Sequence, residues 1–208
     1  MNGLERIRQA FERRKPAFMP YAVLGYPTRE SSLEVIRTLA EEGADLLELG
    51  VPFSDPLADG PVIQAATQRA LENGVTLADC IAMVRRLRDE GLQTAALLMG
   101  YLNPMLAYGL ERLAKDAARA GVDGFIVPDL PPEEANEFEG DCLRQGLALI
   151  YFLAPTSTPE RIRLVAQRAN GFIYLVSVTG VTGERDSLPD GLAETIQRIR
   201  DAADTPVV

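Results

Sequence analysis

The segment LELGVPFSDPLADGP, residues 47–61, joins a short apolar run to a polar loop that contains three prolines. Side chains alternate between the two faces of a β-strand, so Glu48 lies on the face opposite to Leu47 and Leu49. If the leucines pack against helices, Glu48 points into the interior, which is costly unless the acid is paired or used in chemistry. A buried acid bonded to backbone amides would give the same pattern. The segment therefore predicts an α/β fold that holds an acid inside it.

Apolar runs and helical patterns alternate along the whole chain. Strands are expected at 17–24, 45–51, 94–99, 124–127, 147–153, 172–177 and 205–208, with helices before and between them. This alternation indicates a parallel sheet covered by helices, either a (β/α)₈ barrel or a doubly wound open sheet. No Gly-x-Gly-x-x-Gly follows the first expected strand, which disfavours the dinucleotide-binding form of the open sheet. We expect one domain, a TIM barrel over residues 1–208.

Local signals predict several helix ends. Capping patterns occur at Thr28, at Thr76 with Asp79, and at Thr158 before Pro159. We expect one helix after Pro104 that stops at Gly121. Another is expected to open at Pro131-Pro132, with Asp129 as its cap.

A barrel of this type needs about 250 residues, whereas the chain has 208 and stops within its seventh expected strand. An open barrel would leave an unpaired strand edge. We therefore expect the natural chain to continue past Val208, with the barrel incomplete here. The segments Glu-Gly-Ala-Asp at 42–45 and Ala-Gly-Val-Asp at 120–123 are a short internal echo, since both join a helix end to a strand.

The composition argues against several classes of function. The net charge is −9 and basic residues do not cluster beyond Arg13-Arg14-Lys15, which argues against nucleic acid as a partner. The chain has no histidine, so the commonest general base and metal ligand are missing. No apolar run approaches the roughly 20 residues that span a bilayer, and no export signal is recognisable. We expect a cytoplasmic protein with no membrane contact, whose Cys80 and Cys142 are reduced thiols.

Two polar stretches follow expected strands and are candidates for chemistry. Asp55 and Asp59 lie in the proline-stiffened loop after Glu48, where a turn or a helix cap would equally use an aspartate. The second stretch, YLVSVTGVTGER at 174–185, has two glycines that permit close backbone approach to a ligand. A flexible loop without a ligand explains that stretch nearly as well.

Residues 47–61 resemble the signature of tryptophan synthase alpha subunits nearly letter for letter. Four other segments are similar to strand ends of that family, at 18–27 (FMPYAVLGYP), 98–104 (LMGYLNP), 125–131 (FIVPDLP) and 174–183 (YLVSVTGVTG). The resemblance covers essentially the whole chain. It implies a TIM-barrel lyase that cleaves indole-3-glycerol phosphate to indole and glyceraldehyde 3-phosphate.

The resemblance also implies roles for individual residues. Glu48 matches the catalytic general acid/base, and Asp59 matches the carboxylate that bonds the indole N–H. The other matches are the substrate-pocket residues Tyr21 and Tyr174, Thr182, which closes toward Asp59, Gly183, which contacts the substrate phosphate, and the partner-facing positions Asp55 and Asn103. The family commonly has Phe where this chain has Tyr21. Its Gly-Phe-Gly and Gly-Ser phosphate-binding loops would follow Val208.

The family implies no cofactor or metal in this chain. It implies a beta-subunit partner that carries pyridoxal phosphate, in an alpha2-beta2 heterotetramer. The two lysines, Lys15 before the first strand and Lys115 in an expected helix, argue against Schiff-base chemistry. Three alternatives stay open: a stand-alone indole-releasing lyase, a non-catalytic subunit that only binds a beta subunit, and a doubly wound phosphate-binding regulator.

Overall fold

A computed structural model describes residues 1–13, 16–177 and 191–208. Six parallel strands form one sheet: β1 Tyr21–Val23, β2 Leu46–Gly50, β3 Ala95–Met99, β4 Gly124–Ile126, β5 Ala148–Leu153 and β6 Ile173–Leu175. Their order in the sheet is their order in the chain. A doubly wound sheet reverses its strand order at the switch point, so this order identifies an incomplete barrel. The expected fold class is confirmed.

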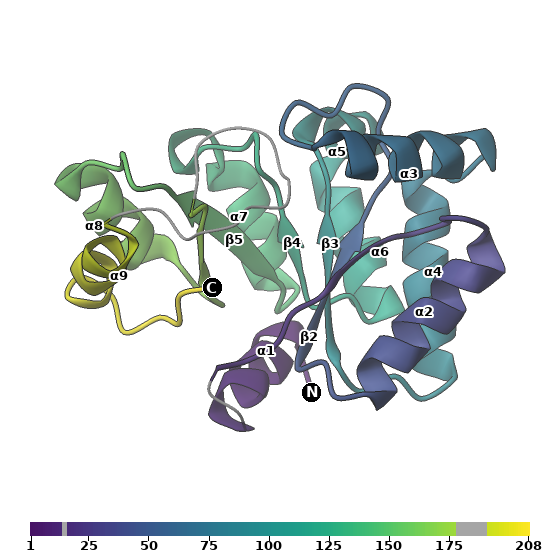
Figure 1. Cartoon of the computed structure of the whole chain (residues 1–208), viewed down its shortest axis with the longest axis horizontal. Helices are drawn as coiled ribbons and strands as arrows, with labels where there is room; N and C mark the ends of the chain where they lie inside the picture. The colour runs from purple at the N-terminus through teal and green to yellow at the C-terminus, as the bar shows by residue number, and fades with distance from the viewer. Residues whose placement is uncertain (14–15, 178–190) are drawn as a thin grey trace.

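Most helices lie on the outer face of the curved sheet, whereas α3 and α5 lie at the carboxyl ends of the strands and α1 lies below their amino ends (Figure 1). Their bounds are α1 Gly3–Arg13, α2 Arg29–Glu41, α3 Pro61–Glu72, α4 Leu77–Asp89, α5 Leu102–Tyr108, α6 Leu110–Ala120, the 3₁₀ turn η1 Pro132–Glu134, α7 Asn136–Arg144, α8 Pro159–Arg168 and α9 Leu192–Arg200. Within the described ranges, no helix is long and apolar enough to cross a membrane.

Alternation along the strands divides the apolar residues into two clusters. On β2, Leu46 belongs to the inner cluster together with Ile7 of α1. Leu47 and Leu49 belong to the outer cluster, which includes Ile36 of α2. Glu48 therefore shares the inner face with Leu46, as the strand pattern predicted.

The expected helix caps at the start of α2, α4 and α8 are confirmed. The Thr28 and Thr158 hydroxyls accept the backbone N–H of Ser31 and Arg161. Thr76 and Asp79 form the full capping box. These caps depend only on neighbours in the sequence, which is why the sequence predicted them.

Two expected helices were wrong in detail. The single helix expected after Pro104 is two helices, because Gly109 takes a φ of +92° between α5 and α6. It also begins earlier, at Leu102, since a proline in the first turn of a helix removes no intrahelical hydrogen bond. The helix expected at Pro131-Pro132 is the 3₁₀ turn η1 followed by α7.

The expected strands at both ends are longer than the observed ones. Residues 17–24 contain only the three-residue strand β1, although the carbonyls of Phe18 and Pro20 still accept N–H groups at the start of β2. Residues 172–177 contain the three-residue β6. The seventh strand expected at 205–208 is a single parallel bridge from Val207 to Ile173.

A buried ion cluster fixes the amino ends of the central strands. The carboxylate of Asp123, fully buried just before β4, accepts the Ala96 N–H at 2.7 Å and pairs with Arg88 of α4 at 2.6 Å. Arg6 of α1 pairs with the same carboxylate. Arg88 also donates to the carbonyl of Gly121. One carboxylate thus joins α1, α4, β3 and the start of β4.

A weaker version of this link recurs before every second strand. Asp45, before β2, accepts the Phe18 N–H at 2.9 Å. Asn170, before β6, accepts the Leu149 N–H at 3.2 Å. Asp123 makes the corresponding bond before β4. The sequence echo at 42–45 and 120–123 therefore reflects one repeated contact between the starts of neighbouring strands.

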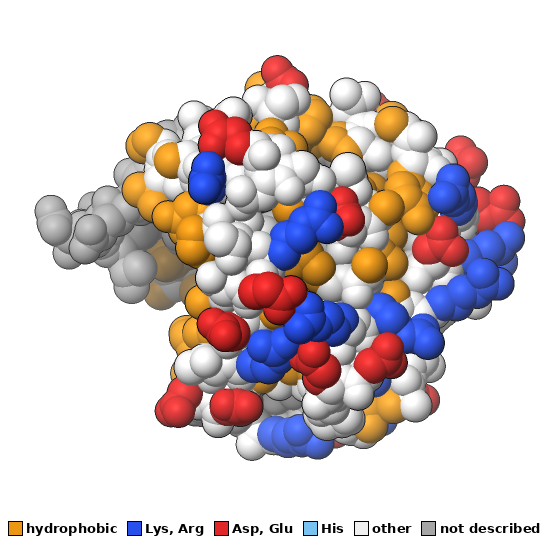
Figure 2. All heavy atoms as spheres, turned by 90° about the vertical axis from the view of Figure 1, so that its right-hand side faces the viewer, with side chains coloured by type: hydrophobic (Ala, Val, Ile, Leu, Met, Phe, Trp, Pro, Cys, Tyr) orange, Lys and Arg blue, Asp and Glu red, His pale blue; other side chains and the backbone are white. Residues whose placement is uncertain are grey.

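The outer surface over α2 and α4 carries mixed charge. Figure 2 shows Lys or Arg beside Asp or Glu on this side of the molecule. Three ion pairs join the two helices or their ends: Arg29–Asp79 at 2.8 Å, Arg37–Glu90 at 2.7 Å and Arg86–Glu30 at 2.7 Å. Exposed pairs of this kind contribute about 0.2–1 kcal/mol each, so the apolar clusters contribute most of the stability.

The recurring link gives a matched test of the buried cluster. We expect Asp123→Asn to lower the free energy of unfolding by about 3–5 kcal/mol, because two partly buried guanidinium groups lose their buried counter-charge. Asp45→Asn removes a carboxylate at the equivalent position that forms no ion pair with any cation among the described residues, and should cost only about 1 kcal/mol. Urea unfolding of both variants measures the difference, and equal costs would contradict the assignment.

Candidate active site

The predicted acid lies inside the sheet. Glu48 is 5% exposed and pairs across the sheet with Tyr21 of β1 and Leu97 of β3. Burial raises the pKa of its carboxyl to about 7, while interaction with the Tyr174 hydroxyl lowers it and the Asp59 carboxylate raises it. A carboxyl with this pKa exists in both protonation states near neutral pH, so it can give and take a proton.

Tyr21 lies against the carboxyl end of β2. Its hydroxyl sits over Gly50, where any side chain would collide with the phenol ring. Burial raises the pKa of Tyr21, and the Asp59 and Glu48 carboxylates raise it further. The phenol is therefore neutral near neutral pH and lies close to both acids.

Tyr174 approaches Glu48 from the other side of the sheet interior. Its ring stacks on Phe152 of β5, with centroids 4.7 Å apart and planes 28° from parallel. Burial raises the pKa of Tyr174, and the Glu48 carboxylate raises it further. Strand alternation puts both rings in the inner cluster. Sequence analysis missed Phe152, whose only signal was its register with Tyr174.

Asp59 lies at the end of the loop after β2 and is 6% exposed. Burial raises the pKa of its carboxyl, and a hydrogen bond from Tyr101 lowers it. The Gln64 amide donates to the Asp59 carbonyl at 2.8 Å, and the Ala58 N–H donates to the Tyr101 hydroxyl at 3.0 Å. Sequence analysis gave no role to Tyr101 or Gln64, because the partners of each lie far along the chain or in a loop without periodicity.

The remaining predicted residues lie elsewhere. Asp55 is exposed and accepts a hydrogen bond from Ser54. Asn103 is exposed in the first turn of α5. The predictions for Thr182 and Gly183 lie outside the described residues. Asp129 was expected to cap the helix after it, but it accepts the Leu102 N–H at 2.9 Å and so caps α5, which precedes it.

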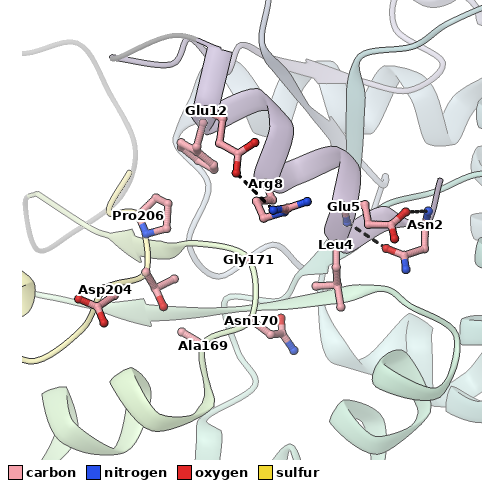
Figure 3. A pocket seen from close by; sticks show the side chains of 12 residues that line it. Asn2, Leu4, Glu5, Arg8, Glu12, Ala169, Asn170, Gly171, Asp204 and Pro206 are labelled. Atoms are coloured by element: carbon pink, nitrogen blue, oxygen red, sulfur yellow. Dashed lines mark hydrogen bonds and ion pairs between the residues drawn. The ribbon is translucent and has the colours of Figure 1, made fainter.

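Two cavities lie away from the carboxylates. One, of about 340 Å³, lies between the loop after β2 and α3, lined in part by Phe53, Pro56 and Gln68. The other, of about 720 Å³, lies at the amino ends of the strands. Figure 3 shows α1 as one of its walls, with residues 169–171 and 204–206 opposite. Neither contains Glu48 or Asp59, so neither replaces the predicted site.

The arrangement concentrates two buried acids and three phenols at the carboxyl end of β2. In barrels of this kind, active sites lie at that end of the strands. One acid titrates near neutrality and the other lies on a loop beyond the strand. In such a site, Glu48 could transfer a proton to or from one atom of a flat, apolar substrate, and Asp59 could accept a hydrogen bond from a donor group of the same substrate.

Comparison with known proteins gives a consistent family. The model of the tryptophan synthase alpha chain matches residues 7–208. The tryptophan synthase alpha chain of Chloroflexus aggregans is 52% identical, with 99% of this chain aligned to 78% of that protein. The protein of the same description from a Roseiflexus species is 54% identical over 93% of this chain and 74% of its own length.

Solved structures agree. The tryptophan synthase structure from Mycobacterium tuberculosis superposes with a TM-score of 0.89 and 36% identity, over 99% of this chain and 79% of that one. The alpha chain from Legionella pneumophila gives a TM-score of 0.87 and 39% identity, over 100% of this chain and 76% of that one. At these identities the likeness extends beyond the fold. The chain belongs to the tryptophan synthase alpha chain family.

Proposed function

We propose that this lyase performs the alpha reaction of tryptophan synthase, the retro-aldol cleavage of indole-3-glycerol phosphate, with Glu48 and Asp59 as its catalytic residues. The observation that carries the proposal is the buried Glu48 carboxyl, whose pKa of about 7 suits an acid that becomes a base within one turnover. The reaction breaks a carbon–carbon bond, so we assign the enzyme to the carbon–carbon lyases.

The proposed step balances through one carboxyl group. Protonated Glu48 gives its proton to C3 of the indole ring, which leaves positive charge on the ring nitrogen. The Asp59 carboxylate accepts a hydrogen bond from that N–H and stabilises the charge. Glu48 then removes the proton of the side-chain hydroxyl next to C3. The electron pair of the broken bond returns to the ring, which leaves as indole, and the former alcohol carbon becomes the aldehyde of glyceraldehyde 3-phosphate.

The phenols suit the substrate. Tyr21, Tyr174 and the stacked Phe152 provide flat apolar surfaces beside the two acids, which favours an aromatic ring as the bound group. We assign Thr182 to loop closure toward Asp59 and Gly183 to a phosphate contact. The chain supplies this chemistry from its own carboxylates, so we propose that it needs no cofactor or metal, and that residues 1–208 act as one domain.

We propose a beta subunit as the partner, bound where the carboxyl ends of β2 and β3 continue into the loop after β2, α3 and α5. The predicted interface residues Asp55 and Asn103 are exposed there. Three apolar side chains on the same elements are also exposed: Leu57 (81%), Val62 (80%) and Leu106 (54%). Exposed apolar groups with a polar rim are typical of protein interfaces. Pyridoxal phosphate would belong to that partner.

Replacing the proposed acid tests the reaction. We expect Glu48→Gln to abolish indole release from indole-3-glycerol phosphate, because an amide neither gives nor takes the proton. Loss of an essential acid/base lowers kcat by about 10²–10⁴-fold. Glu137→Gln, at an exposed position of α7, is the control and should be unchanged. Indole release that survives in Glu48→Gln would overturn the assignment.

The pKa of Glu48 also predicts a link between activity, stability and pH. Activity should fall as pH rises through about 7, because Glu48 loses the proton that it gives to the ring. The raised pKa means that the folded state binds this proton more tightly than the unfolded chain. Stability is therefore highest below the ordinary pKa of glutamate and is lost as pH rises toward 7.

The shift to about 7 corresponds to roughly 3 kcal/mol. As the pH rises from 4 to 8, the free energy of unfolding of Glu48→Gln should therefore increase by about this amount relative to that of the unmodified chain. Urea unfolding at each pH measures the difference. A stability difference that stays constant with pH would contradict the raised pKa.

The partner surface has its own test. Leu57→Asp should weaken binding of a beta subunit by about tenfold or more, since it puts a charge into an apolar contact. Val35→Asp, at a position of α2 that is 47% exposed, is the matched control and should bind normally. Titration calorimetry measures both, and equal affinities would place the interface elsewhere.

A further inference from the structure

Tyr101 contacts the loop after β2 at two points. Its ring packs against Phe53 at the start of this loop, with centroids 5.5 Å apart. Its hydroxyl accepts the Ala58 N–H at 3.0 Å, and the same hydroxyl lowers the pKa of the Asp59 carboxyl at the loop's other end. The residue is 3% exposed. Figure 1 shows the loop and α5, which begins after Tyr101, side by side at the carboxyl ends of the strands.

We propose that Tyr101 is the positioning residue for Asp59: it fixes the loop after β2 so that the Asp59 carboxylate points into the site. This proposal rests on the proposed function for its effect on catalysis, and on the contacts alone for its effect on Asp59. A tyrosine hydroxyl has one proton to donate and lone pairs that accept. Here a lone pair accepts the backbone N–H of residue 58, which leaves the hydroxyl proton for the neighbouring carboxylate of residue 59.

The anchor itself is rigid. Tyr101 is the N-terminal flanking residue of α5, and the next residue, Leu102, donates its N–H to Asp129 at the end of β4. Gly100 donates its N–H to the carbonyl of Ile126 in β4 at 3.0 Å. The backbone on both sides of Tyr101 is thus bonded to the neighbouring strand region. Because its backbone is fixed to the sheet in this way, Tyr101 can hold the loop after β2 in a defined position relative to the sheet.

The charges around Asp59 explain why the hydroxyl matters. Among the described residues, the ionisable groups that act on Asp59 or on its neighbours are Glu48, Tyr21, Tyr101, Tyr174 and Asp129. Burial raises the pKa of the Asp59 carboxyl, and the interaction with the Tyr101 hydroxyl lowers it. Removal of this hydroxyl should therefore move the Asp59 pKa upward and leave the carboxylate free to rotate.

The experiment replaces Tyr101 by Phe, which keeps the ring contact with Phe53 and removes only the hydroxyl. The matched control is Tyr108→Phe on α5, whose hydroxyl donates to the Asp116 carboxylate at 2.9 Å outside the site. Thermal unfolding checks that both variants fold.

The first readout needs no catalysis. The side-chain carboxyls are labelled with ¹³C in aspartate and titrated by NMR, with Asp59→Asn used to assign the Asp59 signal. We expect a higher Asp59 pKa in Tyr101→Phe and an unchanged one in Tyr108→Phe. An Asp59 pKa that is the same in all three proteins overturns the proposal, whether or not the chain releases indole.

The second readout is indole release over a range of pH. We expect kcat to fall by about tenfold to a hundredfold in Tyr101→Phe with KM little changed, since the lost contact stabilises charge that develops only in the transition state. The acid limb of the pH profile should move to higher pH. A normal kcat and profile in a variant with a shifted Asp59 pKa would overturn the positioning role. Indole release that is insensitive to Glu48→Gln would instead refute the proposed function.

Discussion

The fold depends on a carboxylate that has no access to water. Asp123 is fully buried, yet it is matched by Arg88, by Arg6 and by a backbone N–H. An uncompensated charge at that position would cost several kcal/mol, so the folded state needs Arg88, Arg6 and the Ala96 N–H in place around the carboxylate. They come from α4, from α1 and from β3, and their meeting sets how these elements lie at the amino ends of the strands. The carboxyl ends are consequently free to carry short helices and an irregular loop.

Another buried acid, Glu48, has very different neighbours. Glu48 is nearly as buried as Asp123, but the groups that act on it are a phenol and another carboxylate, so its pKa rises to about 7. Burial raises the pKa of both carboxyls, but Arg88, Arg6 and the Ala96 N–H oppose this rise at Asp123, whereas among the described residues only the Tyr174 hydroxyl opposes it at Glu48. The first arrangement stabilises the fold, and the second keeps a proton available at a cost in stability. The proposed catalytic carboxylate and the structural one differ here in their neighbours rather than in their depth of burial.

Sequence patterns predicted what depends on near neighbours. Capping at Thr28, Thr76 and Thr158 and the inward direction of Glu48 follow from local rules of helix and strand geometry. Contacts between distant segments were not visible in the same way. Gly109 splits a continuous helical pattern because of its positive φ, and Asp129 caps an earlier helix because the loop after β4 lies beside the start of α5. The proposed catalytic pair, Glu48 and Asp59, was predicted from a long family signature, whereas Tyr101 was missed because its partners lie more than forty positions away.

The bonds that Asp45, Asp123 and Asn170 accept have a consequence for the symmetry of the chain. They occur before β2, β4 and β6, so the smallest self-similar piece is a pair of strands with their helices, and odd and even strands are not interchangeable. An eight-stranded ring with this spacing would have fourfold rather than eightfold rotational order, in agreement with side-chain layers that come from alternate strands. A duplicated or transplanted segment would therefore have to contain an even number of strands. With an odd number, a backbone N–H that Asp45, Asp123 or Asn170 now binds would face the start of a strand without such a side chain.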